Sequence, residues 1–91
     1  MLYVWMGFLK DAGATIPQDI QQQTTDFLKQ PYIGIQNAGP LLDARGRRVG
    51  MMMVFDIESR TAVEALVANS PYMKAGLYED HRLYEFHDEI G

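Results

Sequence analysis

Hydrophobic residues fill nearly every position of residues 1–9, and this dense pattern predicts a buried β-strand. Apolar side chains occupy both alternating sets: Leu2, Val4, Met6 and Phe8 on one face, and Tyr3, Trp5 and Leu9 on the other. Aromatic and branched side chains are typical of strands, and a strand that is apolar on both faces is usually covered on both. We therefore expect other parts of the protein to cover each face of this strand.

The next apolar residues recur at helical spacing. Pro17 is favoured in a first helical turn, and Pro31 cannot continue a helix, so these two prolines bound the segment. Between them one stripe is formed by Ile16, Ile20, Thr24, Phe27 and Leu28. The pattern predicts an amphipathic helix whose glutamine-rich face lies in solvent.

A β-hairpin is predicted after this helix. Residues 33–42 form its first strand, and residues 43–46 form a turn in which Gly46 can adopt positive φ. Residues 49–57 form its second strand, which is apolar on both faces like the first strand of the chain. Both faces of this strand are therefore also expected to be covered.

The last third of the chain predicts a helix, a short extra turn and a final strand. Ser59 can cap a helix with the apolar stripe Ala62, Val63, Leu66 and Val67. The Ser70-Pro71 pair repeats the cap-plus-proline signal, and Gly76 ends the turn that it begins. Residues 77–87 then form the fourth strand.

The order β-α-β-β-α-β predicts an α+β fold of the ferredoxin-like type, with a four-stranded antiparallel sheet and two helices on one face. Two helices can cover only one face of such a sheet. Since the first and third strands are apolar on both faces, the second face is expected to pack against a second copy of the chain. We therefore predict a sheet-to-sheet homodimer.

Composition narrows the classes of function. The 91 residues suffice for one domain, and 8 basic residues against 12 acidic ones leave no broad basic face for nucleic acid. The absence of cysteine excludes disulfides and thiolate chemistry. Residues 1–9 are too short to span a membrane and follow no basic region, so we expect a cytoplasmic protein with no membrane association.

Several short motifs carry a resemblance to a known family. They are Leu2-Tyr3-Val4, Ala38-Gly39-Pro40-Leu41, the hairpin of residues 46–50, and Pro71-Tyr72 followed by Ala75-Gly76-Leu77-Tyr78. In this order and spacing the chain resembles the YCII-related family of the dimeric α/β-barrel superfamily. The resemblance covers nearly the whole chain, so residues 1–91 are expected to form a single YCII-related domain.

The resemblance implies a pocket beside the Gly-Pro turn but not the usual chemistry. Family members typically carry a histidine on the first helix and an aspartate before the Pro-aromatic pair, which together form an acid–base dyad. Here Ser70 precedes the pair, and an ungapped count back from Gly39-Pro40 places Gln22 at the helix position. Glutamine and serine donate and accept hydrogen bonds but do not titrate near neutral pH. Ligand binding is therefore expected to survive where acid–base catalysis does not.

The ligand-binding candidates are Tyr3, Trp5, Gln22, Gly39, Pro40, Ser70 and Tyr72. Each also has a structural interpretation. Ser70 can be simply a helix cap, Gly39-Pro40 a tight turn at a strand end, and Tyr3 and Trp5 core or dimer-interface residues. Gln22 can equally be an exposed helix residue.

Two functions remain open on the sequence. The first is a small dimeric protein that binds a small apolar or aromatic metabolite without catalysis. The alternative is a lyase or isomerase that acts on a small cyclic acid or lactone, with a base supplied by His81, Asp26 or Asp19. No histidine or carboxylate spacing predicts a metal site, and no cofactor is expected.

Overall fold

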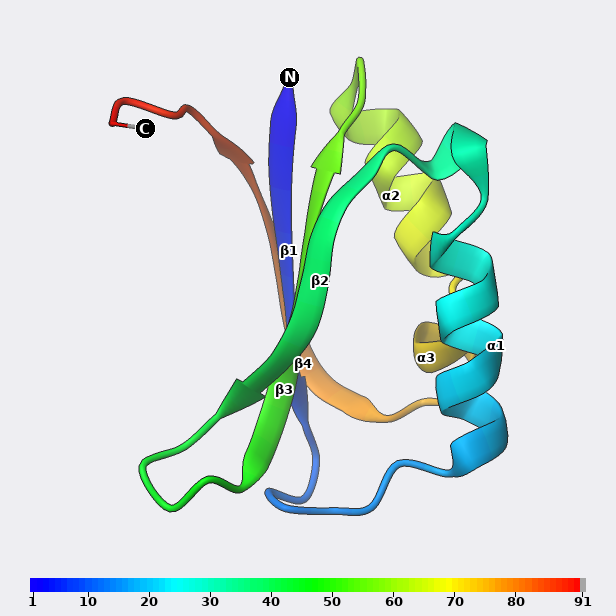
Figure 1. Cartoon of the computed structure of the whole chain (residues 1–91), viewed down its shortest axis with the longest axis vertical. Coiled ribbons are helices and arrows are strands. Elements are labelled where there is room, and N and C mark those ends of the chain that lie inside the picture. Colours follow the sequence, from blue (N-terminus) through cyan, green and yellow to red (C-terminus); the bar gives the residue numbers. More distant parts are fainter. Residues whose placement is uncertain (91) are drawn as a thin grey trace.

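The strands form one antiparallel sheet in the order β2-β3-β1-β4 (Figure 1). The computed structural model describes residues 1–90, apart from the side chain of Tyr32. The strands are β1 (Leu2–Leu9), β2 (Ile35–Leu42), β3 (Arg48–Asp56) and β4 (Tyr78–Phe86). The two strands that are apolar on both faces, β1 and β3, are the central pair, so the ferredoxin-like prediction is confirmed.

The helices all lie on one face of the sheet (Figure 1). They are α1 (Gln18–Leu28), α2 (Arg60–Ala68) and the short α3 (Pro71–Lys74). α2 begins as predicted, because Ser59 Oγ accepts a hydrogen bond from the Ala62 N–H at 3.2 Å. Among the described residues, no helix is long and apolar enough to cross a membrane.

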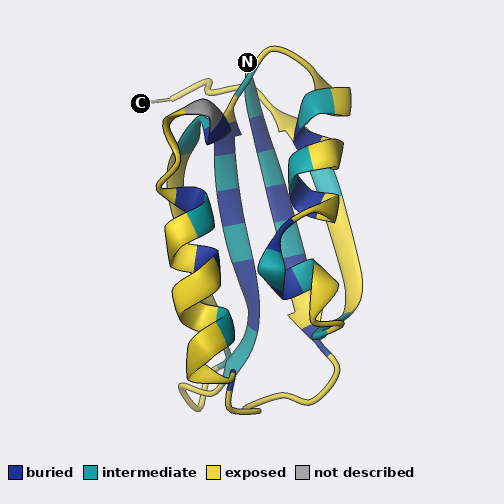
Figure 2. Cartoon of the chain, turned by 90° about the vertical axis from the view of Figure 1, so that its right-hand side faces the viewer, coloured by how far each residue is buried: buried dark blue, intermediate teal, exposed yellow. Residues whose placement is uncertain are grey.

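The core lies between the sheet and the helices. Figure 2 shows the strands from the helix side, with buried and half-buried positions alternating along each central strand. The sheet side of the core consists of Tyr3, Trp5, Leu9, Met51, Met53 and Phe55. These are the odd-numbered positions of β1 and β3, so one of the two apolar faces expected on each strand is covered by the helices.

The prediction that the second strand begins at residue 33 was wrong. Residues Pro31–Ile33 form a turn of 3₁₀ helix, η1, and β2 begins at Ile35. Gly34 lies between them with φ 69°, where a Cβ would collide with the carbonyl oxygen of Asp56. A left-handed residue packed against backbone ends the extended run at this point.

The hairpin turn at residues 43–46 is confirmed, and Asp43 holds it together. Its Oδ1 accepts hydrogen bonds from the backbone N–H groups of Arg45 and Arg47, both at 2.9 Å. Hydrogen bonding by the Arg47 backbone is the main reason that the pKa of Asp43 lies below its ordinary value. Next to this turn the β2–β3 register shifts between Leu41 and Leu42, which takes Arg48 out of the regular alternation.

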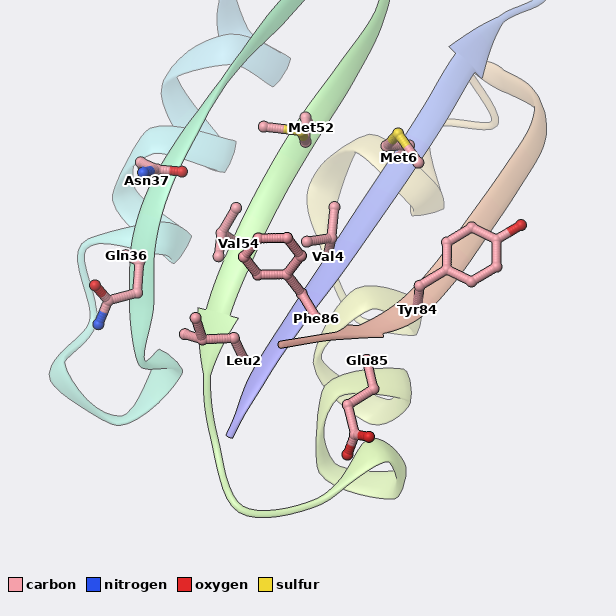
Figure 3. Close-up of a pocket in the computed structure, with 10 residues that line it drawn as sticks. All are labelled: Leu2, Val4, Met6, Gln36, Asn37, Met52, Val54, Tyr84, Glu85 and Phe86. Atoms are coloured by element: carbon pink, nitrogen blue, oxygen red, sulfur yellow. The ribbon is translucent and has the colours of Figure 1, made fainter. Parts of the chain in front are cut away.

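The face of the sheet away from the helices is apolar and uncovered (Figure 3). Its members include Leu2, Val4, Met6, Met52, Val54, Tyr84 and Phe86, which line a shallow hollow of about 550 Å³. Tyr84 and Phe86 remain 50% and 47% exposed. The homodimer expected from the sequence stays a prediction, and this face is where it would form.

Candidate ligand-binding site

A cavity of about 280 Å³ lies between the sheet and the α2–α3 segment. It is lined by Trp5, Glu64, Val67, Ala68, Met73, His81 and Leu83. Trp5 and His81 were both singled out from the sequence, the first as a ligand contact and the second as a candidate base. The structure therefore brings two of the predicted residues into one cavity.

Trp5 reaches this cavity because its neighbours leave room for the indole. It occupies a helix-facing position of β1 and is 1% exposed. Gly7 follows on the same face, where a Cβ would collide with the indole ring of Trp5. The indole also meets Tyr78 edge-on, with ring centroids 5.2 Å apart. Glycine at position 7 is thus required by the position of the tryptophan.

His81 is positioned by the pairing of β4 with β1. It lies opposite Gly7 in the β1–β4 register, and paired residues in antiparallel strands project to the same face. Its ring centroid is 6.1 Å from that of Trp5, and the Trp5 Nε1–H donates a hydrogen bond to His81 Nδ1 at 3.4 Å. In neutral His81 the proton is consequently on Nε2, which can donate to a ligand.

A carboxylate that the sequence did not single out also lines the cavity. Glu64 lies on α2, and its Oε1 pairs with Arg60 Nε at 3.1 Å. The same arginine donates through Nη2 to the carbonyl oxygen of Leu83 at 3.0 Å, which fastens α2 to β4. This four-residue spacing on a helix is a recognisable pairing signal, but it does not reveal that a cavity lies beside it.

The remaining predicted ligand contacts lie elsewhere. Tyr3 and Tyr72 are buried in the core. Ser70 is buried as a helix cap, with its Oγ donating to the Val67 carbonyl at 2.8 Å and accepting from the Met73 N–H at 3.4 Å. Gly39 and Pro40 lie on the edge strand β2.

Gln22 is exposed, and its side-chain amide donates to Asp26 at 2.9 Å. The cavities described here are not lined by Gln22, Gly39 or Ser70. Their assignment to a ligand pocket stays a prediction.

The other candidate bases lie on the solvent side of α1. Asp19 and Asp26 are exposed. His87, the second histidine, pairs with Glu85 at 2.9 Å beyond the end of β4. Within residues 1–90, no group of three histidine or carboxylate side chains is arranged to hold a metal ion.

The inward polar position of α1 is Thr24. It is 2% exposed, and within the described residues its Oγ1 has no hydrogen-bond partner. The periodicity of the sequence placed Thr24 in the apolar stripe of this helix and left Gln22 outside it. The structure agrees, since Thr24 is buried and Gln22 is exposed. A second cavity, of about 480 Å³, lies beside this helix and is lined by residues of α1, η1, β2 and β3.

Comparison with protein families matches residues 1–87 to the YCII-related domain. The chain belongs to the YCII-related family. This membership agrees with the motifs read from the sequence and with the order of the strands. No curated protein matches the chain.

Solved structures share the fold of this YCII-related protein. The 5-chloro-2-hydroxyhydroquinone dehydrochlorinase of Burkholderia phenoliruptrix, in complex with 2,5-dihydroxybenzoquinone, matches with a TM-score of 0.81 at 23% identity, over 96% of this chain and 94% of that one. SnoaB, a cofactor-independent oxygenase of Streptomyces nogalater, matches with a TM-score of 0.54 at 13% identity, over 98% and 94%. Identities this low establish the common fold alone.

Proposed function

We propose that this YCII-related protein binds a small, single-ring aromatic metabolite in the Trp5–His81 cavity. The observation that carries the proposal is that an indole and a hydrogen-bonded imidazole line the same cavity. The volume of about 280 Å³ lies just below the roughly 300 Å³ at which pockets for drug-sized ligands begin. A single ring that contacts Trp5, with a polar group on His81 Nε2, suits a cavity of this size.

The structural relatives support this class of ligand. The dehydrochlorinase carries 2,5-dihydroxybenzoquinone, a single ring with oxygen substituents. Such oxygens accept hydrogen bonds, and neutral His81 offers a donor. The ring would lie against the walls from α2 and α3, which are apolar at Val67, Ala68 and Met73.

Binding without acid–base catalysis is the function that the geometry favours. A general base at Nε2 needs the tautomer with the proton on Nδ1. That proton would point at the Trp5 N–H, and the buried indole N–H would lose its acceptor. The alternative lyase or isomerase activity would have to break this hydrogen bond in order to use His81 as its base.

The test uses native mass spectrometry to identify the co-purifying ligand, followed by titration against the fluorescence of Trp5. Because Trp5 is the single tryptophan of the chain, its emission reports on this cavity. His81→Ala should weaken binding by about tenfold, the range of one hydrogen bond. His81→Gln should bind nearly as well as the parent, since an amide also donates, and His87→Gln serves as the matched control.

Turnover separates the two functions. Catalytic conversion of the ligand that His81→Gln abolishes would favour the lyase or isomerase. Unchanged ligand affinity in His81→Ala would overturn the proposed site.

We further propose that the protein works as a homodimer joined through its uncovered sheet faces. Val4, Met6, Met52 and Val54 from the two central strands, with Tyr84 and Phe86 beside them, make this face apolar. This surface is exposed in the single chain. In a two-fold dimer it would be buried against the same surface of the second copy.

A further inference from the structure

Two hydrogen-bond donors converge on one thioether beneath the helices. Arg48 Nη2 lies 3.8 Å from the sulfur of Met51, and the hydroxyl of Tyr78 lies 3.7 Å from the same atom. Arg48 Nη2 also donates to the Tyr72 hydroxyl at 3.3 Å. A thioether is a weak acceptor, so this spot is rich in donors and poor in acceptors.

The fold brings these side chains together from three elements. The register shift at the start of β3 lets Arg48 reach the helix side of the sheet, where its guanidinium carbon lies 5.8 Å from the Tyr72 ring centroid. Tyr72 is buried on α3, and Tyr78 begins β4. The rings of Tyr72 and Tyr78 are 5.9 Å apart, so both hydroxyls belong to one cluster.

Arg48 has no acidic partner within the described residues. The neighbouring Arg47 pairs with Asp43 at 2.8 Å, whereas no carboxylate among residues 1–90 pairs with Arg48. Its Nε is buried, and no described group accepts a hydrogen bond from it. Burying a donor of a charged group without an acceptor costs free energy. An anion that accepted a hydrogen bond from Arg48 would therefore be stabilised at this site.

Tyr78 adds a neutral donor. Burial is the main cause that raises its pKa above the ordinary value of a tyrosine. Tyr78 is therefore protonated at physiological pH, and its O–H is available to an acceptor stronger than sulfur.

The second cavity adjoins this cluster at Met51. Met51, which occupies the convergence point of the donors, also lines the cavity of about 480 Å³ beside α1. In the part of the chain that the structure describes, the lining of this cavity contains Lys29 and no aspartate or glutamate. Methionine is flexible and repacks readily, so its sulfur can yield to a ligand.

We propose that Arg48 and Tyr78 form a carboxylate-binding site, which a small organic acid reaches from the α1 cavity by displacing the sulfur of Met51. The planar carboxylate accepts from the guanidinium fork of Arg48 and from the Tyr78 hydroxyl. This site goes beyond the proposed function, because neither residue lines the Trp5–His81 cavity.

The test is a titration with benzoate, followed by the NMR signal of the Met51 methyl group at constant ionic strength. The signal is assigned with Met51→Leu. Benzoate should shift it saturably, whereas benzamide, which has nearly the same shape and no charge, should bind at least about tenfold more weakly. Equal affinity for the two probes, or no saturable shift with benzoate, would overturn the proposal.

Two variants test the donors, and a third controls for charge. Arg48→Gln and Tyr78→Phe should each weaken benzoate binding, the first by about tenfold or more. Arg45→Gln makes the same charge change on the exposed hairpin and should leave affinity unchanged. Thermal unfolding of each variant establishes that it is folded, and Tyr78→Phe removes a single hydroxyl if Arg48→Gln fails to fold.

The result is independent of the Trp5–His81 proposal. His81→Ala should not alter the benzoate titration. Loss of benzoate binding in His81→Ala with none in Arg48→Gln would assign the carboxylate to the first cavity and refute this one.

Discussion

At the scale of single residues, two glycines make a matched pair for testing how Trp5 is positioned. A Cβ at Gly7 would collide with the indole, whereas a Cβ at Gly39 would meet nothing within 4 Å. We predict that Gly7→Ala destabilises the protein by about 1–3 kcal/mol, the usual cost of overpacking a core. Urea unfolding followed by circular dichroism measures this, with Gly39→Ala as control. Equal stabilities of the two variants would show that Trp5 has room to move.

Tyr78 should also make the stability fall at alkaline pH. Because burial raises its folded-state pKa, its contribution to folding is fully present below the ordinary tyrosine value of about 10 and is lost as the pH rises from there toward the folded-state pKa. Between pH 9 and pH 11 the melting temperature of the parent should fall more steeply than that of Tyr78→Phe. Equal slopes for the parent and Tyr78→Phe would contradict this prediction.

At the scale of secondary-structure elements, the serine caps of α2 and α3 differ in burial. Ser59 is exposed and accepts one backbone hydrogen bond, whereas Ser70 is buried and both accepts and donates. Ser59→Ala should cost about 1 kcal/mol, a normal loss for a cap. Ser70→Ala should cost more, since it also removes a buried hydrogen bond to the Val67 carbonyl, which then keeps only the bond from the backbone N–H of residue 70. Chemical denaturation that found Ser59→Ala the more damaging would contradict this ranking.

The elements also show what the sequence could predict. Periodicity sufficed for every main helix and strand, and the turn residues predicted the hairpin, because these depend on neighbours a few positions apart. Periodicity also placed Thr24 in the buried stripe of α1. Gln22, which the ungapped count selected, lies on the exposed face of α1, because counting from a motif takes no account of the helical phase.

The site itself depends on pairings distant in sequence. His81 meets Trp5 only through the β1–β4 register, and Arg48 meets Tyr72 only through the irregular start of β3. No local pattern specifies such a register or bulge. For this reason the sequence analysis named Trp5 and His81 separately and assigned no ligand-binding role to Arg48 or Tyr78.

At the scale of the whole molecule, the two faces of β3 differ in their exposure to solvent. Val54 lies on the uncovered face and is half-buried, whereas Phe55, the next residue, lies under the helices and is 1% exposed. Phe55→Asp should unfold the protein, because a buried unpaired carboxylate costs several kcal/mol out of the roughly 5–15 kcal/mol that stabilise a typical domain. Val54→Asp should be tolerated by an isolated chain, since water can still reach its side chain there.

The difference between these adjacent positions becomes a test of the dimer. In a sheet-to-sheet dimer Val54 would be sealed from water, and an aspartate there would break the association without unfolding the subunit. We predict that light scattering at low micromolar concentration gives twice the chain mass for the parent and the single mass for Val54→Asp, with near-parent helical circular dichroism in both. A parent that is already monomeric at that concentration would mean that the apolar face serves something other than a second copy. A Val54→Asp variant that stays dimeric would place the dimer contact elsewhere on the surface.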